Sequence, residues 1–196
     1  MNIKFIYNYF INVENISKLI NYEKINKLVK ELTKLKKKKG RLFILGVGGS
    51  AANASHAVND FRKICEIEAY APTDNISELT ARTNDEGFET IFESWLKISK
   101  LKSNDALLIF SVGGGSKKKK LSINLINAVK YAIKKSIPVY SIVGNRNGYA
   151  YKYSTISILI PSVNKKLITP LSESFQSIIW HCIVSDKRLK KNNTKW

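Results

Sequence analysis

Residues 41–60 read RLFILGVGGSAANASHAVND, and this stretch decides the fold. A short apolar run of strand length (42–45) leads into a glycine-rich turn (46–50), and helix-forming residues follow from Ala51. A strand, turn and helix in this order bring backbone N–H groups and the positive end of a helix together. The stretch predicts an anion site with a phosphate-bearing ligand, and the alternative is a plain strand-to-helix connection.

Length and composition limit the possible classes of protein. The chain has 196 residues, which suits a single domain with a three-layer core, and its 44% hydrophobic content is that of a globular protein. No apolar run approaches the roughly 20 residues of a membrane span, and the N-terminus lacks the pattern of a secretory signal. We therefore expect a cytoplasmic protein with no membrane segment. Cys65 and Cys182 both follow apolar helical stretches, which predicts buried thiols.

The chain is strongly basic, with 33 Lys and Arg against 15 Asp and Glu and a net charge of +18. Such a charge is typical of proteins that bind nucleic acid or another anionic surface. Here the lysines accompany many asparagines and isoleucines and carry no interleaved aromatic residues, so we do not expect nucleic acid as a partner. The runs at 36–39 and 117–120 are predicted to be solvated helix ends. The second run follows a glycine turn, where it can attract a phosphorylated substrate.

Residues 1–39 carry apolar side chains at helical spacing. This pattern predicts two helices, or one long bent helix, with a broad apolar stripe. The stripe is wide enough to favour contact with a second subunit. Gly40 follows the last apolar position and is predicted to end the helix.

The rest of the chain alternates between strand and helix patterns, which indicates a parallel α/β sheet covered by helices on both faces. Ligands in such sheets bind beyond the carboxyl ends of the strands, where both glycine turns (46–50 and 112–116) are expected. The predicted strands after the first are 66–70, 106–111, 138–143 and 157–160, and the predicted helices after the first turn begin near residues 51, 77, 87, 116 and 169.

The two histidines of the chain each lie near a carboxylate at helical spacing. His56 and Asp60 are four residues apart on the first core helix, and Glu173, Ser177 and His181 repeat that spacing on the last helix. Two histidines and two carboxylates on two helices can bind a divalent metal such as Zn²⁺ or act as acid and base.

Each candidate also has a plainer explanation. A histidine four residues before an aspartate is commonly a helix-surface pair, which applies to His56. His181 stands beside a tryptophan and a cysteine, so a core position is the alternative for it. Asp74 follows a proline turn and can cap the helix that begins near Ile76.

Four motifs together resemble the sugar isomerase (SIS) domain family and, within it, the phosphoheptose isomerases. They are GVGGSAANASH (46–56), APTDNISELTARTNDEGFE (71–89), FSVGGGS (110–116) and PLSESFQSIIWH (170–181). The resemblance implies a three-layer α/β sandwich of flavodoxin-like type, with N-terminal helices before a central parallel sheet of about five strands. It also implies a single SIS domain over residues 1–196, with an oligomerisation segment at 1–39, an α/β core at 40–190, and a homotetramer or dimer.

The implied activity is aldose–ketose isomerisation of a phosphorylated sugar. Phosphoheptose isomerases interconvert sedoheptulose 7-phosphate and D-glycero-D-manno-heptose 7-phosphate through an enediol, for the heptose of bacterial surface polysaccharides. Carried over by position, the implied catalytic residues are Asp60, Glu173 and His181, the ligands of a Zn²⁺ ion are His56, Asp60, Glu173 and His181, and the substrate and phosphate residues are Gly48, Gly49, Ser50, Asp74, Ser111, Gly113, Gly114, Gly115 and Ser116.

The chain departs from the family pattern at both turns and at the base. Val47 replaces an Asn of the first loop, and residues 112, 113 and 115 replace the Thr, Ser and Asn of the second. Asp60 stands where the family has Glu, which shortens the side chain by one methylene. These departures favour an alternative function, a non-catalytic SIS module that binds a sugar phosphate and regulates a protein partner. The retained His56, His181 and Glu173 favour the enzyme.

Overall fold

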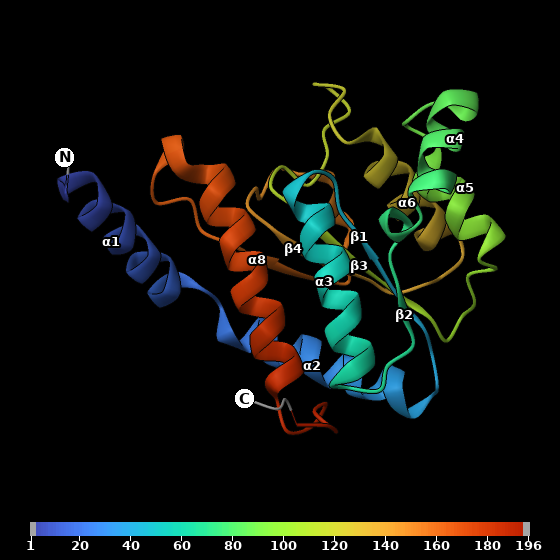
Figure 1. The fold of residues 1–196 in the computed structure, drawn as a ribbon, viewed down its shortest axis with the longest axis horizontal. Helices are drawn as coiled ribbons and strands as arrows, with labels where there is room; N and C mark the ends of the chain where they lie inside the picture. Colours follow the sequence, from blue (N-terminus) through green and yellow to red (C-terminus); the bar gives the residue numbers. More distant parts are fainter. Residues whose placement is uncertain (1–2, 194–196) are drawn as a thin grey trace.

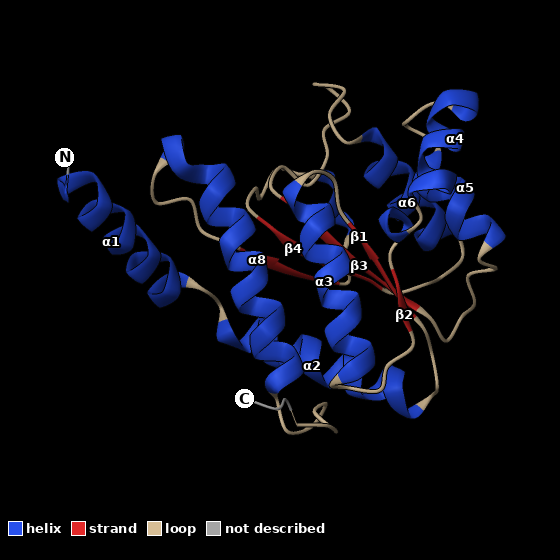
Figure 2. Cartoon of the chain, viewed as in Figure 1, coloured by secondary structure: helices blue, strands red, loops and turns tan. Residues whose placement is uncertain are grey.

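A five-stranded parallel sheet forms the centre of the computed structural model, which describes residues 3–193 (Figures 1 and 2). The strand order across the sheet is β2-β1-β3-β4-β5, and every neighbouring pair is parallel. The predicted fold class is therefore confirmed. The strands are β1 (Leu42–Leu45), β2 (Ala69–Tyr70), β3 (Ala106–Ser111), β4 (Val139–Val143) and β5 (Ile156–Leu159).

Helices cover both faces of this sheet and extend beyond it at the N-terminal end (Figure 1). Among the described residues, no helix combines the length and the hydropathy that crossing a membrane requires. The α-helices are α1 (Ile3–Leu19), α2 (Tyr22–Lys37), α3 (Gly49–Lys63), α4 (Ile76–Glu86), α5 (Ile91–Ile98), α6 (Ile123–Lys134), α7 (Tyr149–Tyr153) and α8 (Ile168–Ser185), and the short 3₁₀ helices are η1 (Pro72–Asp74) and η2 (Lys165–Leu167).

Alternate strand residues supply two separate cores, which explains the continuous apolar runs in the sequence. In β1, Leu42 and Ile44 pack into the core that contains residues of α2, α3 and α8, whereas Phe43 and Leu45 pack into the core of α5, α6 and α7. Successive side chains of a strand point to opposite faces, so a strand covered on both sides needs apolar residues at every position. The result is the predicted three-layer arrangement.

The two glycine turns follow neighbouring strands and lead to opposite faces of the sheet. β1 and β3 lie side by side, but α3, which follows β1, packs on one face of the sheet and α6, which follows β3, packs on the other. This strand order puts a topological switch point of the parallel sheet between β1 and β3. Both turns lie at the upper ends of their strands in Figure 1, below the loop that precedes α6.

The second lysine run is a loop, which corrects the prediction of a helix end at 117–120. Ser116 and Leu121 pair as an isolated antiparallel bridge, with N–H to C=O distances of 2.9 and 3.0 Å in the two directions. Ser122 has a left-handed backbone at φ 49°, and α6 begins only at Ile123. The four lysines therefore lie in a loop that the Ser116–Leu121 bridge closes before α6 begins.

The N-terminal segment consists of two helices, the first of the two alternatives predicted. The side chain of Asn21 accepts a hydrogen bond from the Lys24 N–H at 3.0 Å and so begins α2 as a separate helix. α1 extends away from the sheet (Figure 1), and its apolar side chains are only partly covered. Its exposed large apolar residues are Ile3, Phe5, Ile6, Tyr7, Phe10 and Leu19.

Only one of the two cysteines is buried. Cys65 is fully buried in the core beside α8, whereas Cys182 is exposed on the outer face of α8, so the prediction of a buried thiol was wrong for Cys182. Burial raises the pKa of the Cys65 thiol to about 11.

We expect iodoacetamide at pH 8 to alkylate Cys182 and to leave Cys65 unmodified in the folded protein. Alkylation requires the thiolate, and a thiol with a pKa near 11 is only about one part in a thousand ionised at pH 8. Mass spectrometry of tryptic peptides measures both sites. The same reaction in denaturant is the control and should label both cysteines; equal labelling in the folded protein would contradict the buried position of Cys65.

Candidate functional site

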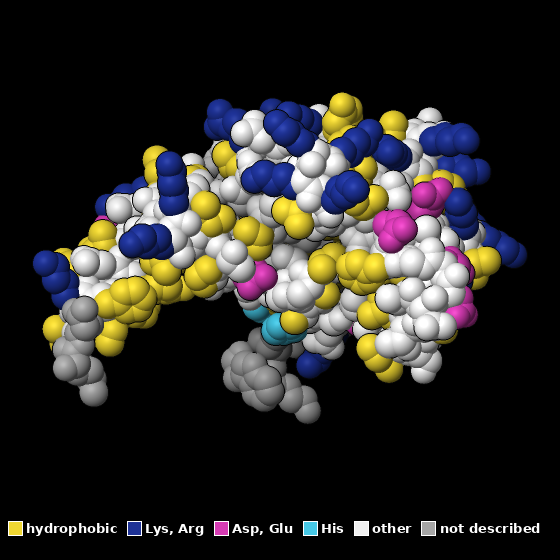
Figure 3. All heavy atoms as spheres, turned by 90° about the horizontal axis from the view of Figure 1, so that it is seen from above, with side chains coloured by type: hydrophobic (Ala, Val, Ile, Leu, Met, Phe, Trp, Pro, Cys, Tyr) yellow, Lys and Arg dark blue, Asp and Glu magenta, His cyan; other side chains and the backbone are white. Residues whose placement is uncertain are grey.

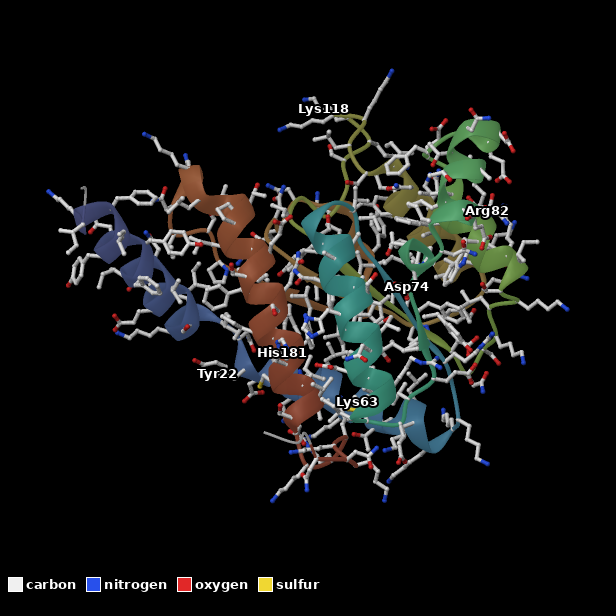
Figure 4. All side chains as sticks on the ribbon, viewed as in Figure 1. Tyr22, Lys63, Asp74, Arg82, Lys118 and His181 are labelled. Atoms are coloured by element: carbon white, nitrogen blue, oxygen red, sulfur yellow. The ribbon has the colours of Figure 1, made fainter. Side chains whose placement is uncertain are left out.

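Three predicted site residues meet where α3 packs beside α8. The nearest ligand atoms of His56, Asp60 and His181 all lie within 4.8 Å of one another, and the His181 Nε2 is 3.7 Å from the Asp60 Oδ2. The two imidazole centroids are 5.3 Å apart. Figure 4 shows His181 on the part of α8 that lies alongside α3. The four-residue spacing put His56 and Asp60 on one face of α3, and the packing of α8 against α3 brings His181 beside them.

An amide side chain connects the two helices beside this group. The Asn53 Nδ2 donates to the backbone carbonyl of Glu173 at 2.9 Å and to the Gln176 Oε1 at 3.0 Å. Gln176 is completely buried, so this contact holds α3 against α8 away from solvent. Sequence reasoning did not single out Asn53. The available signal was an asparagine within an alanine-rich, core-facing stretch of helix.

The hydrogen bonds of His181 define its tautomer. Its Nδ1 is 3.2 Å from the Ser177 Oγ, which can donate or accept, and 2.9 Å from the Ser177 backbone carbonyl oxygen, which can only accept; the shorter contact assigns the proton to Nδ1. In the neutral ring the lone pair is then on Nε2, the atom that faces Asp60. A neighbouring carbonyl that orients an imidazole in this way is common for histidines that bind a metal or transfer protons.

A buried tryptophan supports both imidazoles. Trp180 has no exposed surface, and its ring centroid is 3.5 Å from that of His181 and 4.7 Å from that of His56. Asp60 is 8% exposed and accepts a hydrogen bond from the Asn59 Nδ2 at 2.9 Å, whereas both histidines are open to solvent. The group is thus rigid on its inner side and open to a ligand on its outer side.

Glu173 lies apart from the other three residues. Its carboxylate contacts Gly49 at the start of α3, where even a single added methyl group would collide with it. Glu173 precedes His181 by eight residues, which corresponds to about 12 Å along a helix. The structure therefore divides the four-residue group predicted from the sequence: His56, Asp60 and His181 are together, and Glu173 is at the first glycine turn.

The first glycine turn leads directly into α3. Gly48 has a left-handed backbone at φ 63° and precedes the helix without a side-chain cap, and Ser50 is 2% exposed in the first turn of α3. Gly46 packs so closely on the backbone of Ser50 that no side chain fits there. No side chain of this turn caps the N-terminus of α3, but the Glu173 carboxylate lies against Gly49 there, so the anion site predicted for this turn stays a prediction.

The second glycine turn is held by its own serines. The Ser111 Oγ accepts from the Gly114 N–H at 2.9 Å, and the Ser116 Oγ accepts from the Lys119 N–H at 3.3 Å. Gly114 and Gly115 have left-handed backbones at φ 70° and 82°. Both hydroxyls therefore shape the turn, and the roles of Ser111 and Ser116 as phosphate ligands stay predictions.

A cleft of about 550 Å³ opens between this turn and the loop after β4. That volume is within the usual range of small-molecule sites. Lys119 is the one charged residue among those that line the cleft; the sequence had indicated the whole run 117–120 as attracting a phosphorylated substrate, without distinguishing Lys119 within it. The lining residues are Gly113, Gly115, Ser116, Lys119, Leu121, Ser122, Asn145, Asn147 and Gly148.

Asp74 is exposed on η1. The Thr73 hydroxyl of η1 lies 3.3 Å from the Ser55 hydroxyl of α3, and this hydrogen bond connects the two helices. In the view of Figure 4, α3 lies between Asp74 and His181. The cap of α4 is Asn75, whose side chain accepts from the Glu78 N–H at 3.2 Å, so the alternative role of Asp74 as that cap is wrong. The structure does not bring Asp74 into the histidine group.

Comparison with known proteins identifies the family. Residues 8–144, more than half of the chain, match the family model described as the SIS domain. The chain belongs to the SIS domain family. A phosphoheptose isomerase of Buchnera aphidicola subsp. Schizaphis graminum is 30% identical to this SIS domain protein over 163 residues, which cover 81% of this chain and 77% of the relative.

Two further similarities define how far the relationship extends. The lincomycin biosynthesis protein LmbN of Streptomyces lincolnensis is 30% identical over 154 residues, and the matched region covers 74% of this chain but 54% of LmbN. The structure of phosphoheptose isomerase GmhA from Neisseria gonorrhoeae superimposes with a TM-score of 0.79 at 23% identity, over 94% of this SIS domain protein and 97% of that chain. At this identity the superposition shows a shared fold.

Proposed function

We propose that this SIS domain protein is a phosphosugar aldose–ketose isomerase that converts sedoheptulose 7-phosphate into D-glycero-D-manno-heptose 7-phosphate. The observation that carries the proposal is the pairing of the Asp60 carboxylate with the His181 Nε2 at 3.7 Å on an open face. A base and an acid next to each other are what proton transfer between adjacent carbons requires. Relatives named phosphoheptose isomerase support the choice of substrate.

In the proposed reaction, Asp60 takes the proton from C1 of the ketose. The electron pair of that C–H bond forms a C1–C2 double bond, and O2 takes a proton from His181, which gives the enediol. Return of the proton from Asp60 to C2, with loss of the O1 proton to His181, gives the aldose. Asp60 suits the role of base because an ionised carboxylate only accepts hydrogen bonds. His181 suits the role of acid in its imidazolium form, in which Nδ1–H is bound to the Ser177 carbonyl and Nε2–H is left to donate to the substrate O2.

The distance between the turns and the histidine group fits this substrate. His56 follows Gly49 by seven residues, about 10 Å along α3. In sedoheptulose 7-phosphate the reacting carbons, C1 and C2, are at the opposite end of the chain from the phosphate. We assign the phosphate to the glycine turns and the reacting carbons to the Asp60 and His181 end. Glu173, beside Gly49, is placed to accept hydrogen bonds from sugar hydroxyls between them.

The donor atoms of the histidine group also fit a zinc ion. Two imidazoles and one carboxylate are a common set of protein ligands in catalytic zinc sites. We propose that His56, Asp60 and His181 would hold Zn²⁺ in the absence of substrate, and that the His181 Nε2 and one Asp60 oxygen are released for proton transfer when the substrate binds; Glu173 is too far along α8 to belong to this set. A bound zinc ion polarises substrate oxygens as a Lewis acid. Trp180 then excludes water from the inner side of the site.

The proposal includes a homodimer or homotetramer that forms through residues 1–39. The exposed apolar side chains of α1 support this role, because apolar surface in water is unfavourable and contact with a second subunit would bury it (Figure 3). It also includes a cytoplasmic location, since a charged sugar phosphate does not cross a lipid bilayer unaided.

The proposal is tested by an NMR or coupled assay of the purified protein with sedoheptulose 7-phosphate, first after removal of metals and then with added zinc. We expect heptose 7-phosphate to appear, and to appear faster with zinc. Zinc alone should also raise the melting temperature, since a ligand at 100 times its Kd stabilises the folded state by about 2.7 kcal/mol.

The matched control for the zinc effect is Asp74→Asn, because Asp74 is an exposed carboxylate outside the histidine group. The rise in its melting temperature with zinc alone should equal that of the unmodified protein. No product in either condition, together with a rise in melting temperature on adding the sugar phosphate, would overturn the enzyme and support the non-catalytic binding module.

A further inference from the structure

The lysine loop at 117–120 is positioned over the cleft by contacts at both of its ends. The Ser116–Leu121 bridge closes its base, and the Lys119 N–H donates to the Ser116 Oγ, which fixes the middle of the loop against a cleft-lining residue. At the start of the loop, the Lys117 Nζ lies 5.5 Å above the ring of Tyr149 on α7. Lys119 lines the cleft, whereas Lys118 does not.

The backbone of the glycine turn offers free donors to the same cleft. The N–H groups of Gly113 and Gly115 have no acceptor within residues 3–193, and both glycines line the cleft. Ser122 precedes α6 without a side-chain hydrogen bond, so its hydroxyl and the positive end of α6 also face this region. Backbone N–H groups gathered in one turn are a common way to bind an anion.

Charge in the cleft has one sign. Lys119 lines it, and no aspartate or glutamate is among its lining residues. Lys and Arg side chains also gather over the surrounding face, which is the one seen from above in Figure 3. A site with free N–H donors and only positive charge favours an anion with several oxygens, such as a phosphate group, over a neutral ligand.

We propose that Lys119 is a phosphate-binding residue, whose ammonium group holds the phosphate of the substrate against the backbone N–H groups of Gly113 and Gly115. The turn has glycine or valine at 112, 113 and 115, so it presents no side-chain hydroxyl there, and Lys119 supplies the missing contact as a charge. The other three lysines attract the anion but do not touch it. This inference rests on the proposed function for the identity of the ligand as a sugar phosphate.

The first test measures binding of inorganic phosphate by isothermal titration calorimetry at constant ionic strength. Lys119→Gln should raise the Kd by about 10- to 100-fold, the usual range for a charge-assisted hydrogen bond. The matched control is Lys118→Gln, which removes the same charge from the same loop and should change the Kd less than three-fold. Gly113→Ala is a second probe: the space around its Cβ is empty, so the fold tolerates the methyl group, which then obstructs the cleft and weakens binding.

The second test measures turnover of sedoheptulose 7-phosphate. Lys119→Gln should raise KM by a factor similar to its effect on the Kd and leave kcat within two-fold, because the phosphate is remote from the reacting carbons. The Lys119 proposal is overturned if the unmodified protein does not bind phosphate, if Lys119→Gln binds it normally, or if Lys118→Gln weakens binding equally. If phosphate binding depends on Lys119 but no sugar phosphate turns over, Lys119 stands as proposed and only the isomerase fails.

Discussion

Replacing His181 with alanine is expected to lower kcat for sedoheptulose 7-phosphate by about 10²- to 10⁴-fold, the usual contribution of a positioned general acid. Within the group of His56, Asp60 and His181, the residue contributed by α8 is His181, and its Nε2 is 3.7 Å from the Asp60 Oδ2. Its loss leaves O2 of the enediol without a proton source, while the phosphate end of the site is untouched. KM should therefore change much less than kcat. Steady-state kinetics of the purified variant measures both constants.

The fold should survive this change, because the His181 side chain is 46% exposed and packs on Trp180 without being enclosed. Cys182→Ala is the matched control, since Cys182 is the next residue on α8, is exposed, and is outside the histidine group. A normal melting temperature with normal turnover in His181→Ala would remove this residue from the mechanism. Normal turnover in the control with lost turnover in His181→Ala would assign the loss to the imidazole.

The largest expected effect on stability comes from Asp105, at the opposite edge of the sheet. Its carboxylate is 1% exposed and accepts hydrogen bonds from the Arg41 backbone N–H at 2.9 Å, from the Arg41 Nη2 at 2.7 Å and from the Lys102 N–H at 2.8 Å. This contact joins the residues that precede β1 and β3. It also raises the pKa of the Arg41 guanidinium.

We expect Asp105→Ala to lower the free energy of unfolding by about 3–5 kcal/mol, the usual result of removing one partner from a buried ion pair. The change leaves the Arg41 guanidinium, which is largely covered, without its counter-charge. Urea denaturation followed by circular dichroism measures the loss. Asp186→Ala is the control, because Asp186 pairs with Arg188 on the surface and such pairs contribute at most about 1 kcal/mol. Equal effects of the two substitutions would contradict this account.

The sheet could be predicted because both of its faces are buried. Continuous apolar runs such as 106–111 have no other stable position than a strand covered by helices on two sides. The exceptions are local. The predicted strand at 66–70 shrinks to the two residues of β2, where pairing with the edge of β1 ends. The helix predicted from residue 116 starts at Ile123, because a left-handed Ser122 and the bridge before it are invisible to apolar periodicity.

The candidate site could be predicted in part. Spacing of four residues correctly put His56 beside Asp60, but it applied equally to Glu173 and His181 on α8. The residues of α3 that lie beside a given residue of α8 depend on how the two helices pack, and the local sequence pattern does not determine this packing. The burial of Asp60 and the exposure of Cys182 likewise depend on neighbours that are far away in the sequence.

The Ser116–Leu121 bridge also has a consequence for protein engineering. Because the bridge joins the two ends of the lysine loop directly, the residues between them can change in number or charge without moving the glycine turn or α6. The loop is therefore a suitable place to alter ligand preference. Acidic or neutral replacements at 117–120 would make the cleft favour less negatively charged sugars, while the sheet and the packing of α3 against α8 stay unchanged.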